Sequence, residues 1–593
     1  MTYKPSMLKS AVRHLTNTLV GVGICTGLAG CYASFSQIDD RVSRLLDESS
    51  GEMNAVAAPV PESWAENTLS DGTLDAPDPP TYNPPAGDLM FESAANDDIN
   101  SAIGRLNDLI TKNGEGELLT LKDALLYSVQ FSREYQYAME TYVIECLQLL
   151  IQRHLWGPQF FDTVRFDVNG AGSSGLYETS MDIVNDFGVS QRLPYGGEVS
   201  VQYLASFAKT LHDSVTDGSL DSLSSGTIVL GANIPLLRNA GPIAQENLIQ
   251  AERDLTYAAR DFEDFRRTFF FQVVRDYLDL LVARQTIANG ETSVELYEKL
   301  SERQKALYEA GRVPLYAAAE AENNALQEQS RQANRWEQYR VNLDRFKVKL
   351  NWPVEKPVRI HNVAFAIDPP VVDMETAISD GLARRLDLQT LRDRMVDRER
   401  TLRNAKNQLL PDLNLSAGVT IPSREEEDGS SSFMPEIGDT DFNAGVTLGI
   451  PLDREIEKLT VREAQILLER NRLELSQALD TAAVEIRAAV RDIDASLFSL
   501  DIQKRNVEIA QLNIDAINAN PDSVSVLNQL EAIRSLRSAE DGRAQAFRNL
   551  QISILQYLLG SGQLRVQPDG MMEQLPGMQM KPTEDLSYGD NPA

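Results

Sequence analysis

The sequence has few of the residues that enzymes and metal proteins use for their chemistry. The cysteines Cys25, Cys31 and Cys146 are too few and too oddly placed for a disulfide framework or a zinc site with paired ligands. The four histidines stand at no metal-ligand spacing: His14, His154, His212 and His361. A glycine-rich phosphate loop and a nucleophile elbow are also missing. These absences predict that the protein is not an enzyme and needs no cofactor or metal.

Basic residues are scarce as well. The chain has 56 Lys and Arg against 87 Asp and Glu, which gives a net charge of −31. Because binding to phosphates relies on clustered Lys and Arg, this composition excludes a nucleic-acid partner. Paired carboxylates are so common in this chain that they indicate nothing about catalysis.

The amino terminus lacks a hydrophobic run long enough to span a membrane as a helix. The basic residues Lys4, Lys9 and Arg13 precede a mildly apolar stretch, residues 15–24, that glycines interrupt. This arrangement is typical of a secretory signal peptide, which we assign to residues 1–30.

The end of this leader, Leu28-Ala29-Gly30-Cys31, resembles the bacterial lipobox. The resemblance implies that a diacylglyceryl group is attached to the thiol of Cys31 and anchors the chain to a membrane. The next residue is Tyr32 rather than Asp, which by resemblance to lipoprotein sorting favours the outer membrane. An ordinary signal peptide with a chance cysteine is the alternative.

Two segments are too polar and too rich in proline to predict a packed core. Residues 31–100 contain acidic and Pro-rich runs, such as the stretch 75–80, and we expect a mobile tether there. Residues 561–593 have a similar composition, and we expect a disordered carboxy-terminal tail.

Between these segments the chain looks duplicated. The sequence IPLLR at 234–238 returns as IPLDR at 450–454, an offset of 450 − 234 = 216 residues. Each copy closes a strand in which apolar and polar residues alternate. The apolar members are Ile228, Leu230, Ala232 and Ile234 before the first copy, and Phe442, Ala444, Val446, Leu448 and Ile450 before the second.

Similar alternation over 163–169 and 412–421 predicts a β hairpin in each repeat, at 161–235 and 410–451. A soluble sandwich could show the same pattern, but strands of this length also suit a bilayer. Four strands cannot close a barrel, so a membrane barrel requires several chains. The first hairpin is larger and contains an additional strand pair near 183–207. The sequence leaves open whether that pair joins the barrel.

After each closing strand, apolar residues recur at alternating spacings of 3 and 4, which is the period of a coiled coil and predicts that they share the packed side of a helix. They are Leu248, Ala251, Leu255, Ala258, Phe262, Phe265 and Phe269 in the first repeat, and Leu475, Leu479, Ala482, Ile486, Ala489 and Ile493 in the second. Helical hairpins are expected at 242–350 and at 454–559, with breaks near 311–314 and 520–522. The first repeat therefore covers residues 101–350 and the second covers 351–560.

In these features the chain resembles the TolC-type outer membrane efflux protein family, from about residue 121 to residue 559. The stretch LKDAL at 121–125 resembles the helix that opens a repeat in this family, and ARRLDL at 383–388 resembles its counterpart in the second repeat. LPDLNLS at 410–416 resembles the entry to the second hairpin, and YEAGRV at 308–313 resembles the tip of a helical hairpin. The resemblance implies an α+β membrane protein: a homotrimer that shares one β-barrel in the outer membrane, continued by an α-helical tube in the periplasm. Its partners would be a periplasmic adaptor and an inner-membrane pump.

The resemblance also implies that the helical tips contact the adaptor, and we assign that role to five residues: Gly311, Arg312, Val313, Asn520 and Pro521. Because a tube narrows where its helices converge, acidic residues near the tips are candidates for a gating ring. These residues are Asp515, Asp522, Glu309 and Glu320. A solvated helix face is the alternative explanation for each of them.

The function predicted from the sequence is that of a passive exit duct in a tripartite efflux or type I secretion system. The sequence does not distinguish these two systems or identify the cargo. The alternative from another class is a lipid-anchored structural coiled-coil protein of the cell envelope without a pore.

Overall fold

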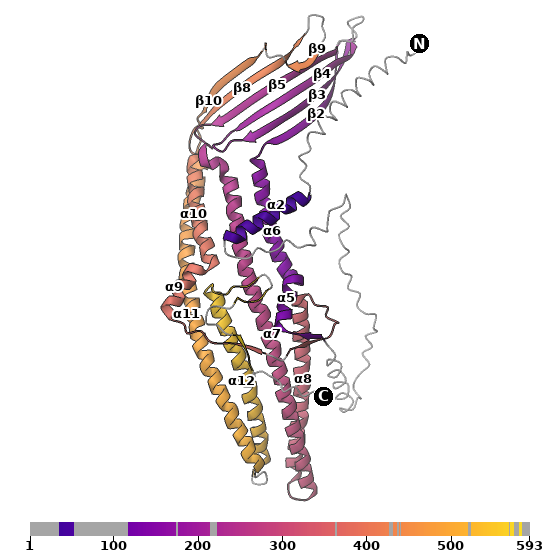
Figure 1. The fold of residues 1–593 in the computed structure, drawn as a ribbon, viewed down its shortest axis with the longest axis vertical. Helices are drawn as coiled ribbons and strands as arrows, with labels where there is room; N and C mark the ends of the chain where they lie inside the picture. The colour runs from indigo at the N-terminus through magenta and orange to yellow at the C-terminus, as the bar shows by residue number, and fades with distance from the viewer. Residues whose placement is uncertain are drawn as a thin grey trace, which may run out of the picture.

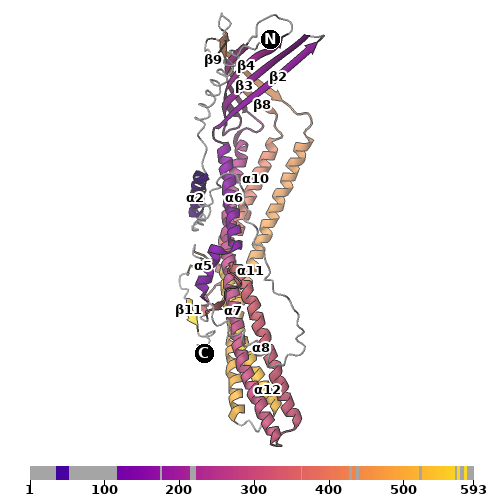
Figure 2. The same ribbon diagram turned by 90° about the vertical axis from the view of Figure 1, so that its right-hand side faces the viewer.

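The computed structural model describes residues 35–52, 117–173, 176–213, 222–361, 364–425, 431–435, 438, 440–519, 524–567, 570–573 and 580–583. A β-sheet lies at one end of the elongated molecule, and long helices run from it to the other end (Figure 1). The side view also shows the long helices extending from the sheet end to the opposite end (Figure 2).

In the described part of the chain, the sheet contains seven strands, each antiparallel to its neighbours. These are β2 (Gln159–Ser173), β3 (Leu176–Arg192), β4 (Glu198–Asp213), β5 (Ser222–Pro235), β8 (Asp412–Glu425), β9 (Ser431–Pro435) and β10 (Asp441–Gly449). The main order is β10-β8-β5-β4-β3-β2, with the short β9 paired to β8. Strands of both repeats therefore form one sheet, joined where β5 pairs with β8.

Four long helices form the two predicted helical hairpins. The first hairpin consists of α7 (Glu246–Glu309), which follows the short helix η2 (Gly241–Gln245), and α8 (Leu315–Leu350). The second consists of α11 (Glu455–Ala519) and α12 (Val526–Gly560). The coiled-coil spacing correctly predicted the packed side: Leu255, Phe262 and Phe269 of α7 are all buried.

Shorter helices lead into each half of the sheet. In the first repeat, α5 (Leu121–Phe131) is followed by α6 (Arg133–Leu155), and in the second, α9 (Met374–Arg384) is followed by α10 (Leu386–Asn407). The linking residues have nearly the same extended backbone, with φ −64° and ψ 127° at Ser132, and φ −64° and ψ 124° at Arg385. The counterpart of residues 121–125 is thus the start of α9. The stretch 383–388, predicted for that role, spans the α9–α10 junction instead.

The two IPLxR copies mark the points where strands pass into helices. The guanidinium of Arg238 donates to Gln408 Oε1 at 2.7 Å, and that of Arg454 donates to the carbonyl of Leu409 at 2.7 Å. Both arginines therefore contact the residues that follow α10.

Two small sheets and the main apolar core lie beside the middle of the helices. Strand β1 (Glu117–Leu119) pairs with β6 (Val358–Ile360), and β11 (Met580–Thr583) pairs with β7 (Ala364–Ile367). Leu564 and Met572 are buried in the same core as Tyr277. The expectation of a disordered tail over 561–593 is therefore wrong for residues 561–567, 570–573 and 580–583.

Part of the predicted tether is also ordered. Residues Phe35–Glu52 form helix α2, which crosses α6 (Figure 1). Its side chains Val42, Leu45 and Leu46 are buried, and the Cys146 thiol of α6 donates to the carbonyl of Val42 at 3.9 Å. The prediction failed here because these apolar residues, spaced for a helix, lie within an acidic segment. Cys31 lies outside the described residues.

Among the described residues, no helix combines the length and the apolar composition that a membrane span requires.

Candidate channel wall and helical tips

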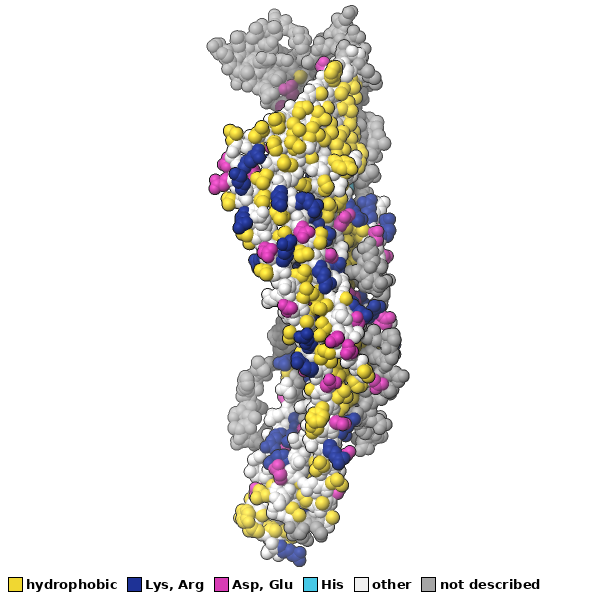
Figure 3. Space-filling model, turned by 90° about the vertical axis from the view of Figure 1, so that its left-hand side faces the viewer, with side chains coloured by type: hydrophobic (Ala, Val, Ile, Leu, Met, Phe, Trp, Pro, Cys, Tyr) yellow, Lys and Arg dark blue, Asp and Glu magenta, His cyan; other side chains and the backbone are white. Residues whose placement is uncertain are grey.

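The sheet has two chemically distinct faces, because its strands pair in a register that keeps the alternating residues aligned. One cross-strand row contains Phe160, Val189, Val201, Leu230, Val419 and Phe442. Hydrophobic side chains cover much of the sheet end in the view of Figure 3, whereas charged side chains are spread over the helices. On the apolar side, two polar side chains of neighbouring strands pair with each other, since Asn185 Nδ2 donates to Asp162 Oδ1 at 2.7 Å.

The opposite face is polar and carries mostly small side chains. Its central row contains Ser190, Ser200, Gly231, Gly418 and Asn443. Among the strand side chains that the structure describes, this face carries two arginines and six acids. They are Arg165 and Arg192, and Asp167, Asp182, Asp186, Glu198, Asp412 and Asp441. A sheet that is apolar on one side and polar on the other suits a wall between lipid and water.

The first helical tip is a compact turn between α7 and α8. Gly311 adopts a positive φ of 71°, its amide donates to the carbonyl of Tyr308 at 2.8 Å, and the amide of Arg312 donates to that of Leu307 at 2.8 Å. These two bonds form a Schellman motif, which satisfies carbonyls at the end of α7. Gly311 and Arg312 are exposed and Val313 is half-buried, so all three reach the surface of the tip.

The gating candidates are distributed over both tips. Glu309 and Asp515 are exposed and Glu320 is half-buried; Asp515 Oδ1 accepts a hydrogen bond from Gln511 at 3.1 Å. Asn520, Pro521 and Asp522 lie outside the described residues. The single chain does not bring the described candidates together, which leaves the ring a prediction for an assembly.

Farther from the tips, a buried ion cluster joins the two helical hairpins. Glu328 of α8 is 1% exposed; one carboxylate oxygen accepts from Arg335 at 2.8 Å and from Arg537 of α12 at 3.0 Å. The other oxygen accepts from Arg331 at 3.1 Å. Burial acts to raise the pKa of Glu328, but the three guanidinium groups outweigh it and hold the pKa below its usual value. Glu328 is therefore charged and links segments 209 residues apart.

Helix α7 joins the same cluster through close packing. Gln332 Nε2 donates to the carbonyl of Ile287 at 2.8 Å, and Asn289 Nδ2 donates to Asp541 of α12 at 2.9 Å. A Cβ atom on Gly290 would lie 2.0 Å from Gln332 Oε1, so only glycine fits without a shift of that side chain. The sequence analysis missed this cluster, because one glutamate among many does not stand out and its partner Arg537 is distant in the sequence.

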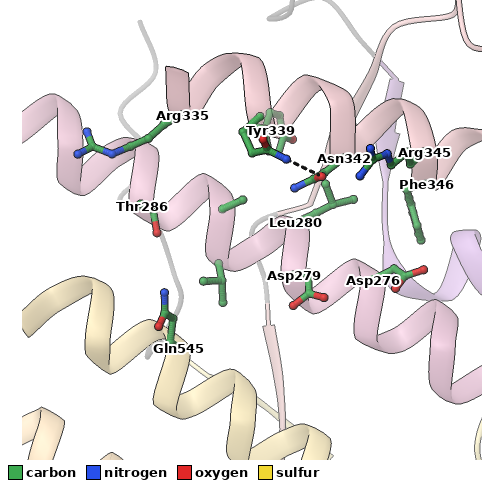
Figure 4. Close-up of a pocket in the computed structure, with 13 residues that line it drawn as sticks. Asp276, Asp279, Leu280, Thr286, Arg335, Tyr339, Asn342, Arg345, Phe346 and Gln545 are labelled. Carbon is green, nitrogen blue, oxygen red and sulfur yellow. Dashed lines mark hydrogen bonds between the residues drawn. The ribbon is translucent and has the colours of Figure 1, made fainter. Parts of the chain in front are cut away.

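Closer to the middle of the molecule, α7, α8 and α12 border a groove of about 530 Å³ (Figure 4). The two acids that line it are already paired: Asp276 with Lys349 at 2.7 Å and Asp279 with Arg548 at 2.6 Å. Gln338 donates to Asn342 at 3.2 Å along one side. The groove is open along the helices and therefore offers no enclosed pocket for a small substrate.

Comparison with protein-family models gives no match, and no curated protein is similar in sequence. Solved structures are similar in fold. The outer membrane protein VceC of Vibrio cholerae has a TM-score of 0.56 and 13% identity, over 74% of this chain and 96% of VceC. The CmeC outer membrane channel of Campylobacter jejuni has a TM-score of 0.52 and 15% identity, over 75% of this chain and 85% of CmeC. The outer-membrane channel OprN has a TM-score of 0.55 and 15% identity, over 74% of this chain and 89% of OprN.

These similarities define the class of fold: the chain has the architecture of outer-membrane channels. The particular resemblance drawn from the sequence, to the TolC-type outer membrane efflux proteins, is confirmed at the level of the fold.

Proposed function

We propose that three copies of this chain form a passive exit duct through the outer membrane. The observation that carries this proposal is the two-faced sheet, which is open at β2 and β10 and continues directly into long helices. An open sheet edge is not viable in lipid, since its backbone groups would have no hydrogen-bond partners. Closure by neighbouring copies satisfies those groups and places the polar face around a water-filled lumen.

The remaining parts of the proposal rest on the sequence resemblance to the lipobox and to the TolC-type family. Lipid on Cys31 anchors the chain in the outer membrane, and the helical hairpins extend into the periplasm. A periplasmic adaptor contacts the tips around Gly311 to Val313, and an inner-membrane pump supplies the energy, either for efflux or for type I secretion. The chain itself moves cargo without chemistry.

Disulfide cross-linking tests the assembly. Phe160 of β2 and Leu448 of β10 are exposed, lie on the apolar face and stand near the helical end of the two sheet edges. We expect the double variant Phe160→Cys with Leu448→Cys to give covalent dimers and trimers in outer membranes. Each single variant should give neither species. Absence of cross-linking in the double variant, as a pore-free coiled-coil protein predicts, would refute the shared barrel.

The gating ring has a separate test. Three copies of Asp522 at one height would attract cations, so Asp522→Ala should lower the cation selectivity of single channels. Unchanged selectivity would remove this residue from the ring while leaving the duct intact.

A further inference from the structure

The additional strand pair of the first repeat is part of the sheet wall. Ser132 and Pro235 are 103 residues apart, whereas Arg385 and Pro451 are 66 apart, a difference of 37 residues. Strands β3 and β4 cover nearly this length, 176–213, and lie between β2 and β5. Backbone pairing with β3 runs along the whole of β2, from Gln159 opposite Ser190 to Ser173 opposite Leu176. The insertion therefore widens the sheet and does not project from it.

The width of the six main strands matches the width of the four helices below them. Four helices meet the sheet: α6 leads into β2, β5 into α7, α10 into β8, and β10 into α11. Packed helices are about 8–10 Å apart, so four of them occupy an arc of about 32–40 Å. Strands about 4.8 Å apart and tilted by about 40° occupy about 6.3 Å each, so six main strands cover about 38 Å. Four strands would cover only about 25 Å.

We propose that β2 of one copy pairs with β10 of the next, so that three copies close an eighteen-stranded barrel as wide as the helical tube. This proposal rests on the proposed function, because it requires the trimeric duct. Eighteen strands at the same spacing and tilt give a backbone radius of about 18 Å, compared with about 12 Å for twelve.

The two sheet edges are compatible with this pairing. Strand β2 begins, and β10 ends, at the helical end of the sheet, so the two run antiparallel when copies stand side by side. All the strand pairs within the sheet of one copy are antiparallel as well. The residues of β10 are exposed along nearly its whole length, and among the described residues β10 is paired on one edge, to β8, which leaves its other edge for a strand of the next copy.

The polar face leaves the proposed lumen open. In the row that runs from Gln159 to Asn443, the residues between these two are serine and glycine, which take little space. The short strand β9 lies on the other, apolar face, where Tyr203 Oη donates to the carbonyl of Phe433 at 2.7 Å and a Cβ on Gly226 would lie 2.0 Å from that oxygen. If inward side chains take about 5 Å from the backbone radius, the eighteen-stranded barrel admits solutes of about 13 Å radius. A twelve-stranded barrel admits solutes of about 7 Å radius.

The matched control is a variant without residues 176–213. In this variant, residues 174–175 and 214–221 connect β2 directly to β5. These two strands already run antiparallel, so they can pair as a hairpin, and each copy then has four main strands. Both proteins are reconstituted in planar bilayers, and polyethylene glycols of increasing radius are added to each side in turn. We expect the full chain to admit polymers of about twice the radius that the variant admits, from the side opposite the helical tips.

The outcomes separate this inference from the proposed function. Equal cut-off radii in two trimeric, conducting proteins would overturn the eighteen-stranded barrel and leave the channel standing. No conductance from the full chain would overturn the channel itself. If the variant does not assemble, strand counting by electron cryomicroscopy of the full-length trimer decides: eighteen main strands support the inference and twelve overturn it.

Discussion

Replacement of Glu328 by Gln tests the cluster that joins the two helical hairpins. The carboxylate is 1% exposed, and its partners Arg335 and Arg537 are also mostly buried. Removal of one partner from a buried ion pair typically costs about 3–5 kcal/mol, and Gln keeps the volume and part of the hydrogen bonding, so we expect a loss of about 2–3 kcal/mol. Glu531 provides a matched control, because it pairs with Arg534 at 3.1 Å on the exposed side of α12. Glu531→Gln should cost less than about 0.5 kcal/mol.

The assay measures the free energy of unfolding of the purified protein in denaturant, with reversible unfolding monitored by circular dichroism. A double-mutant cycle with Arg537→Gln should show a coupling free energy of about 1–3 kcal/mol with Glu328→Gln. Additive effects, or a Glu328 variant as stable as the Glu531 control, would refute the reasoning.

The pH dependence follows from the same carboxylate. Because the guanidinium groups hold the pKa of Glu328 below its usual value, its stabilising effect is complete above about pH 4.3, the unfolded value, and is lost as the pH falls through the folded pKa. The stability difference between the natural chain and Glu328→Gln should therefore shrink in acid. Asp541 acts in the opposite direction, because burial and, to a smaller extent, the charge of Glu328 raise its pKa; the effect of burial is common to both proteins. A difference that stays constant between pH 7 and pH 3 would contradict this account.

Three further predictions, one of them with a matched control variant, test the account in other places. Gly290→Ala should cost about 1–3 kcal/mol, because the added Cβ displaces Gln332 from the carbonyl of Ile287; an unchanged unfolding midpoint would contradict that contact. Val201→Arg should lower the yield of membrane-inserted trimer, since a cation on the lipid face costs up to about 2–4 kcal/mol, whereas Gln202→Arg on the polar face should insert normally; equal yields would argue against the assigned faces. Cys31→Ser should abolish incorporation of radiolabelled palmitate, and retained label would exclude lipid attachment at this residue.

Much of the fold could be predicted from the sequence, because strands and helices each impose a period. Alternation identified the residues of β5, β8 and β10 that share a face, and the spacing of 3 and 4 identified the packed side of α7. Alternation says which face a residue occupies but not which strand is its neighbour. The sequence therefore left the place of the β3–β4 pair open until the register was known.

The errors have a common physical origin. Helix α2 and strand β11 lie in acidic or proline-containing segments, where composition predicts disorder, yet each finds a partner elsewhere in the chain. Glu328 is similar, because its significance depends on burial and on an arginine 209 residues away. Local pattern identifies elements, whereas contacts between distant segments decide which polar residues and which chain ends become ordered.

The most direct test of the central claim is single-channel recording from the purified full-length protein in planar bilayers. The account predicts discrete conductance steps from a trimeric species and cation selectivity, since acids outnumber arginines on the polar face of the sheet. A folded, membrane-bound protein that never conducts would contradict it and would favour a structural coiled-coil protein of the cell envelope.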